Sequence, residues 1–184
     1  MPMLRDSREK SFIGRYSTFA SVEKYLQDIV GVLMGNERLK RLLYYTDSKA
    51  LSLPKLTQKQ AYELLNHQIK VVPKIDLEPD AKPYVVVSLD NFVPQEGQTT
   101  FRSVQLSFDI VAPFEYWPME DFKLRPYSIA GEIDAMINHS NFFEGIANFI
   151  GAKQLILNDY VGGLTLYYLI EVYGDDKKLH PEND

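Results

Sequence analysis

Residues 102–113 read RSVQLSFDIVAP, and apolar and polar side chains alternate along this stretch. The apolar positions are Val104, Leu106, Phe108, Ile110 and Ala112. The polar positions are Ser103, Gln105, Ser107 and Asp109. Because successive side chains of a β-strand point to opposite faces, the pattern predicts a strand with one dry face and one wet face.

A second strand is predicted directly upstream, over residues 84–89. This run, YVVVSL, is apolar at nearly every position, which is typical of a strand that is covered on both faces. The segment between the two strands, PQEGQTT, contains Gly97 and is typical of a hairpin loop. We therefore expect the two strands to pair antiparallel.

Helical periodicity appears both before and after this predicted hairpin. An apolar stripe begins after Thr18 and ends at Gly35, and Asn36 is a suitable N-cap for a second, short helix. Thr57 and Gln60 have the spacing of a capping box, which predicts a helix over about 58–69. A further helix is predicted over 127–139, with these residues inward: Ile129, Ile133, Met136 and Ile137.

Two more strands are predicted near the C-terminus, over 155–157 and 164–172, around a turn at the sequence VGG. The element order is then helices followed by β-β-α-β-β. This order predicts an α+β fold with an antiparallel or mixed sheet and helices packed on one face. We divide the chain into an extended arm (1–16), a single α+β domain (17–174) and a polar C-terminal tail (175–184).

Composition indicates one folded domain. The chain has 184 residues, 45% of them hydrophobic, which is enough to bury a sizeable core. It has no cysteine, so disulfides and thiolate chemistry are excluded. No apolar run approaches the roughly 20 residues that span a bilayer, and the first ten residues are polar, so we expect a cytoplasmic product.

Charge is distributed unevenly along the chain. Residues 1–60 carry 11 Lys/Arg against 6 Asp/Glu, while residues 61–184 carry 9 against 19. The basic residues of the arm are Arg5, Arg8, Lys10 and Arg15. A basic arm on an acidic body is compatible with nucleic-acid binding, with docking onto the acidic face of a neighbouring copy, or with solvated charge that has no partner.

No pattern in the chain predicts catalysis. There is no phosphate-binding loop and no G-x-G-x-x-G, and the three histidines are far apart in the sequence. Four acids surround the first predicted strand: Asp76, Glu78, Asp80 and Asp90. A metal-dependent nuclease would also need a lysine on the next strand, and none lies between Gly97 and Pro118. We expect no enzyme, no metal and no cofactor.

The proline-bounded segment 112–126 has many aromatic residues. It contains Phe114, Tyr116, Phe122 and Trp117, which is the only tryptophan. These side chains are compatible with capping the end of the core, and equally with anchoring a protein interface, where Trp and Tyr are favoured.

Taken together, four segments resemble the tail-terminator, or tail-completion, proteins of long-tailed bacteriophages: PYVVVSLDNF, SVQLSFDIV, SIAGEIDAMIN and LILNDYVGGLTLYYLIEVYG. In that family a "P-Y-hydrophobic" strand precedes a long hairpin, a helix and a final strand pair. The resemblance covers about residues 20–174, and head–tail connector and neck proteins look similar.

The resemblance implies a structural virion protein whose copies form a ring, typically a hexamer, on the end of a tail tube. Such a ring ends tube polymerisation, contacts the tube protein, offers a surface to the neck or head-completion protein and lets DNA pass without specific binding. The expected location is the tail end of the virion, after assembly in the host cytoplasm.

On this reading Ser103, Gln105, Ser107 and Asp109 face a neighbouring subunit, the tube or the DNA channel. Phe114, Tyr116 and Trp117, and the basic residues of the arm, are further candidate interface residues. The alternatives are a neck or connector protein on the head side and a small binding domain that forms no ring.

Overall fold

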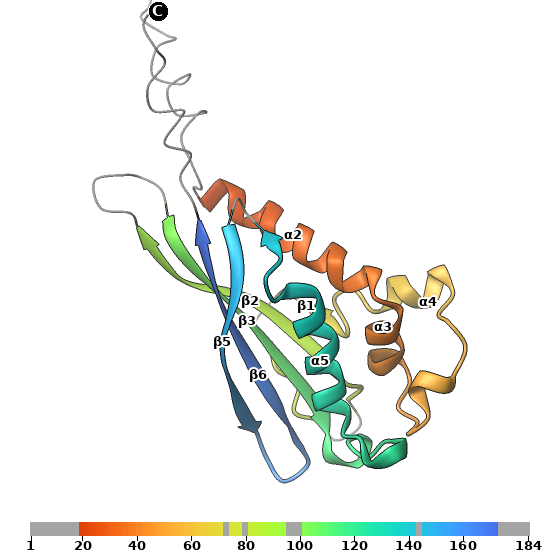
Figure 1. Cartoon of the computed structure of the whole chain (residues 1–184). Helices are drawn as coiled ribbons and strands as arrows, with labels where there is room; N and C mark the ends of the chain where they lie inside the picture. The colour runs from red at the N-terminus through yellow and green to blue at the C-terminus, as the bar shows by residue number, and fades with distance from the viewer. Residues whose placement is uncertain (1–18, 72–73, 79–80, 95–100, 143–144, 173–184) are drawn as a thin grey trace, which may run out of the picture.

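Two β-hairpins lie side by side in one sheet, and helices pack on one face of it (Figure 1). The computed structural model describes residues 19–71, 74–78, 81–94, 101–142 and 145–172. The helices are α2 (Phe19–Gly35), α3 (Glu37–Tyr44), α4 (Gln58–Glu63) and α5 (Arg125–Ile137). The strands are β1 (Ile69–Lys70), β2 (Tyr84–Pro94), β3 (Phe101–Pro113), β4 (Asn141–Phe142), β5 (Gly145–Ile156) and β6 (Val161–Val172).

The sheet has six strands in the order β1-β2-β3-β6-β5-β4. β1 runs parallel to β2, and every other neighbouring pair is antiparallel. Phe108 of β3 lies opposite Val87 of β2 and Leu166 of β6, which places the stretch quoted first at the centre of the sheet. The prediction of an α+β fold with a mixed sheet and helices on one face is confirmed.

The main core fills the space between the sheet and helices α2, α3 and α5. It includes Leu106, Phe108 and Ile110 of β3, which are fully buried together with Ile129 and Ile133 of α5. Asn36 caps α3 as expected, since its side-chain oxygen accepts hydrogen bonds from the backbone N–H groups of Arg38 and Leu39. The apolar stripes of α2, α3 and α5 therefore face the side of the sheet on which the core residues of β3 lie.

The helix predicted over 58–69 is shorter than expected. The Thr57–Gln60 capping box is present, but α4 ends at Glu63. The carbonyl of Leu64 accepts hydrogen bonds from the N–H groups of Gln68 and Ile69, and Asn66 has a φ of 65°. This left-handed residue turns the chain, so that Ile69 and Lys70 join the sheet as β1.

The C-terminal hairpin is longer than predicted, and the expected turn at VGG was wrong. β5 begins at Gly145, in a stretch that we expected to be a connector, and the turn lies at residues 157–160. The side-chain oxygen of Asn158 accepts hydrogen bonds from the N–H groups of Tyr160 and Val161, which closes the turn.

Gly162 and Gly163 lie inside β6. An added Cβ at Gly163 would lie 1.7 Å from the carbonyl oxygen of Ile110, so a close backbone approach requires this glycine.

The expected arm (1–16), the polar tail (175–184) and residues 95–100 of the predicted hairpin loop lie outside the described residues. Within the described part of the chain, no helix is long and apolar enough to cross a membrane.

Candidate interaction face of the sheet

The face of the sheet opposite α2, α3 and α5 carries the predicted wet side of β3. No described helix covers it (Figure 1). Ser103, Gln105, Ser107 and Asp109 lie on this face, because they alternate with the core residues Leu106 and Phe108. We call it the open face.

Strand register extends the open face across the neighbouring strands. Ser107 lies between Ser88 of β2 and Tyr167 of β6, and Gln105 lies between Asp90 and Leu169. Ser103 lies opposite Glu171. The centre of the open face therefore combines short polar side chains with the half-buried Tyr167 and Leu169. Mixed polar and apolar character of this kind is typical of protein interfaces.

Asp109 is the acidic group nearest the middle of this face. Its Oδ1 accepts a hydrogen bond of 2.7 Å from the hydroxyl of Thr165. Thr165 and Ser107 are each only 5% exposed, although no helix covers them, because neighbouring side chains surround their short ones. The wet face is thus drier at its centre than the alternation alone predicted. Gln105 is held at its side-chain oxygen by the amide of Asn91, at 2.7 Å.

One end of the open face is covered by residues 74–78. Asp76 forms ion pairs with Lys70 and Lys74, and its backbone N–H donates to the hydroxyl of Tyr84 at 2.7 Å. Asn158 donates a hydrogen bond to the carbonyl of Leu77. These contacts hold the segment over a small second apolar cluster: Tyr84, Val86, Val111 and Val161.

The acidic residues near the first strand do not converge on a metal site in the part of the chain that is described. The hydrogen bond from Lys70 holds the pKa of Asp76 below its ordinary value. Burial raises the pKa of Tyr84 to about 12. Among described residues no group of three or more His, Asp or Glu is placed to hold a metal ion, and Asp80 lies outside them. Asp76 therefore acts as a structural ion-pair partner.

The aromatic segment after β3 lies on the helix side of the sheet, away from the open face. Trp117 Nε1 donates to the carbonyl of Ala112 at 3.1 Å, and its ring meets that of Phe114 edge-to-face, with centroids 5.1 Å apart. The Phe114 ring also lies against Gly162, where an added Cβ would be 2.9 Å from it. Phe114, Tyr116 and Trp117 are half-buried, so they cap one end of the sheet and keep part of their surface exposed.

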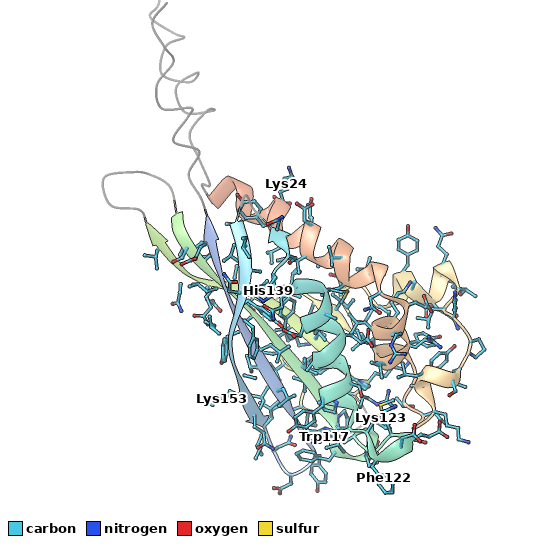
Figure 2. All side chains as sticks on the ribbon, in the orientation of Figure 1. Lys24, Trp117, Phe122, Lys123, His139 and Lys153 are labelled. Atoms are coloured by element: carbon cyan, nitrogen blue, oxygen red, sulfur yellow. The ribbon has the colours of Figure 1, made fainter. Side chains whose placement is uncertain are left out.

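Phe122 differs from the other aromatics of this segment. Its side chain is fully exposed, and both it and Asp121 have positive φ values, of 56° and 58°. In Figure 2 it projects from the loop below Trp117. A bulky residue at positive φ is a strained conformation, which the sequence does not reveal.

Sequence reasoning missed Arg125, the largest fully buried side chain among the described residues. Its guanidinium donates to the carbonyls of Tyr116, Leu42, Tyr45, Thr46 and Asp47, at 2.6–3.0 Å. Burial lowers its pKa to about 10, so it stays charged at neutral pH. Arg125 thus ties the end of α3 to the aromatic segment. An arginine before a proline gives no sequence signal for this role.

The open face, the aromatic segment and the arm are each predicted to supply interface residues. The first two lie on opposite sides of the sheet, and Arg5, Arg8, Lys10 and Arg15 lie outside the described residues. A ring subunit has more than one contact surface, so the two sides are compatible with different neighbours.

An α+β domain with one sheet face that no described helix covers is the class that the fold defines. The family model YomW matches residues 36–170, from the cap of α3 to near the end of β6. The chain belongs to the YomW family, a phage-derived family of the SPbeta-like prophage type, and this indicates a phage protein. No curated protein and no solved structure matched the chain.

Proposed function

We propose that the protein is a structural component of a phage virion, whose copies form a ring on the end of a tail tube. The ring stops polymerisation of the tube and offers a surface for head attachment. The proposal includes no catalytic step and no cofactor, and DNA passes through the ring without specific binding. The observation that carries it is the open face, in a chain of a phage-derived family.

The open face is suited to contact with protein. Tyr167 and Leu169 supply apolar area at its centre. The short side chains of Ser107 and Thr165 would not sterically block a flat partner surface. Three acids and one lysine that are not buried are distributed over this face: Asp90, Asp109, Glu171 and Lys153. A second lysine, Lys70, lies opposite Val86 but is buried and paired with Asp76. We assign the face to a neighbouring subunit or to the tube protein, with the acidic groups favouring a basic partner surface.

The acidic groups of the open face are also consistent with DNA passing through the ring without specific binding. Acidic side chains repel the phosphate backbone, so residues of the face that remain next to the channel would let DNA slide past. The neck or head-completion protein would then meet another surface of the same ring, and the partially exposed aromatic segment at the sheet end is our candidate for it.

The test is the mass of the purified protein over a concentration series, by native mass spectrometry and light scattering, with and without tail tubes. Negative-stain images of the same samples show whether rings form. Rings, or a monomer that forms rings on added tubes, support the proposal. A monomer that ignores tubes contradicts it, and rings that bind only the portal side would assign the protein to the neck.

The open face is tested by Gln105→Lys combined with Asp109→Lys, which reverses its central charge. We expect loss of ring formation with little change in the melting temperature. The matched control is Gln154→Lys with Asp159→Lys, because both residues are exposed and lie off this face. Equal assembly by the two double variants would rule out the open face as a contact.

A further inference from the structure

An apolar groove lies between α2 and α4, away from the open face. Its volume is about 450 Å³. Its walls are Val30, Gly31 and Met34 of α2, with Ala61, Tyr62 and Leu65 from α4 and the turn after it. The polar groups of the lining side chains are the amides of Gln27 and Gln58 and the hydroxyl of Tyr62. Tyr62, a large aromatic residue of the groove wall, is 63% exposed, so the described residues do not cover it.

Gly31 leaves open space in the wall of the groove. It lies in the interior of α2 and is exposed, and a Cβ built there would meet no atom within 4 Å among the described residues. A glycine at such a position costs about 1 kcal/mol in helix stability relative to alanine. Neither a neighbour nor a positive φ in the described structure requires it. The lack of a side chain leaves space for another chain against α2.

Helix α4 gives an independent indication. It has a complete capping box, yet none of its six residues is buried in the described structure. Helices this short depend on packing of an apolar face for stability. The face that α4 turns toward α2 is the groove wall, so the packing that would stabilise it is incomplete.

We propose that this groove is the docking site of the chain's own N-terminal segment, residues 1–18, with Phe12 and Ile13 as the side chains that fill it. The segment ends at Phe19, where α2 begins, and α2 forms one wall of the groove. Phe12 and Ile13 are the pair of adjacent large apolar residues nearest to α2, since the other such pair, Met3 and Leu4, lies close to the start of the sequence.

The segment is long enough to reach the groove within one chain. Val30 lies 11 residues along α2 from Phe19, which is about 17 Å at 1.5 Å per residue. The six residues from Ile13 to Phe19 span up to about 20 Å when extended. Charge is also complementary, since the exposed Asp28 and Glu63 follow the lining residues Gln27 and Tyr62 in the sequence. The segment carries Lys10 and Arg15 on either side of the apolar pair.

The test uses disulfide trapping in the full chain, which has no native cysteine. Ile13→Cys is combined with Gly31→Cys in the groove, or with Gly131→Cys on α5 as the matched control. Gly131 is also an exposed helical glycine with open space at its Cβ position. We expect the 13–31 disulfide to form at least about tenfold faster than 13–131, because docking raises the local concentration of residue 13.

The expected product is a monomer with an internal loop, which migrates differently under non-reducing conditions. Equal rates for the two pairs would overturn the proposal. A covalent dimer as the only 13–31 product would also overturn it, by placing the segment of a second copy in the groove.

A second measurement avoids the introduced cysteines. Trypsin cleavage at Arg15 should be slow in the wild-type chain and several-fold faster in Ala61→Glu, which puts a charge into the groove wall. Gly131→Glu is the control, with circular dichroism to check folding. Unchanged cleavage in a folded Ala61→Glu protein would refute docking. The proposal does not rest on ring formation, since a docked segment in a protein that stays monomeric with added tail tubes would support docking and contradict the ring.

Discussion

Arg125 Nε donates a hydrogen bond of 2.8 Å to the backbone carbonyl of Tyr116, and this contact joins the first turn of α5 to the aromatic segment. The same guanidinium reaches four carbonyls at the end of α3 and just beyond it. Five backbone acceptors from two distant segments thus share one buried cation. Such a fork of donors is specific to arginine.

Arg125→Met is expected to lower the free energy of unfolding by about 3 kcal/mol or more, because buried carbonyls that lose a charged donor cost about 1–3 kcal/mol each. Denaturant titration followed by Trp117 fluorescence measures this. Arg38→Met is the control, since Arg38 pairs with Glu132 at an exposed position, where ion pairs contribute about 0–1 kcal/mol. Similar losses in the two variants would contradict the role of Arg125.

Two glycine-to-alanine substitutions should have opposite effects on stability. Gly163→Ala places a Cβ 1.7 Å from the Ile110 carbonyl oxygen, so the central strands must separate, with a loss of about 3 kcal/mol, near the upper end of typical point mutations. Gly131→Ala has open space in α5 and should stabilise by about 0.5–1 kcal/mol. Thermal unfolding of both variants measures these changes in stability. A Gly163→Ala protein as stable as wild type would contradict the pairing register of β3 and β6.

Acid should weaken the attachment of residues 74–78. The pKa of Asp76 is lowered in the folded state, so its ion pair contributes stability that is fully present above the ordinary carboxyl pKa of 3.8 and is lost as the pH falls further. We expect Asp76→Asn to be less stable than wild type at pH 7, and the difference to shrink below pH 3.8.

Denaturant midpoints at several pH values test this. Glu78→Gln, two residues along the same segment, is the control. If the gap between Asp76→Asn and wild type does not change with pH, the stabilising role of this ion pair is refuted.

Trp117 tests whether the aromatic segment is an interface. Trp117→Ala is expected to impair ring assembly more than it lowers the free energy of unfolding, because part of the indole surface is exposed and can contact a partner. Trp117→Phe should preserve the packing on Phe114 and lose only the hydrogen bond to Ala112. Proportional losses of assembly and of folding would make Trp117 a residue of the core alone.

Local patterns determined most of the fold. The alternation along 102–113 identified β3 and its two faces, and the apolar stripes identified α2 and α5 within about two residues. Asn36 and Thr57 fixed helix starts because capping is a contact between residues two or three apart. The family match indicates a phage protein, in agreement with the resemblance, while the ring remains a prediction.

The sequence alone determined which side chains of a strand or helix share a face, because periodicity is a local property of the chain. Only the tertiary structure decided where distant segments meet: that Ile69 pairs with Val85, that Gly163 lies against Ile110, and that Arg125 reaches the end of α3. It also placed the aromatic segment and the open face on opposite sides of the sheet. The physical reason is that a strand's neighbours and a buried cation's acceptors are chosen by packing between residues far apart in the chain, which no local pattern records.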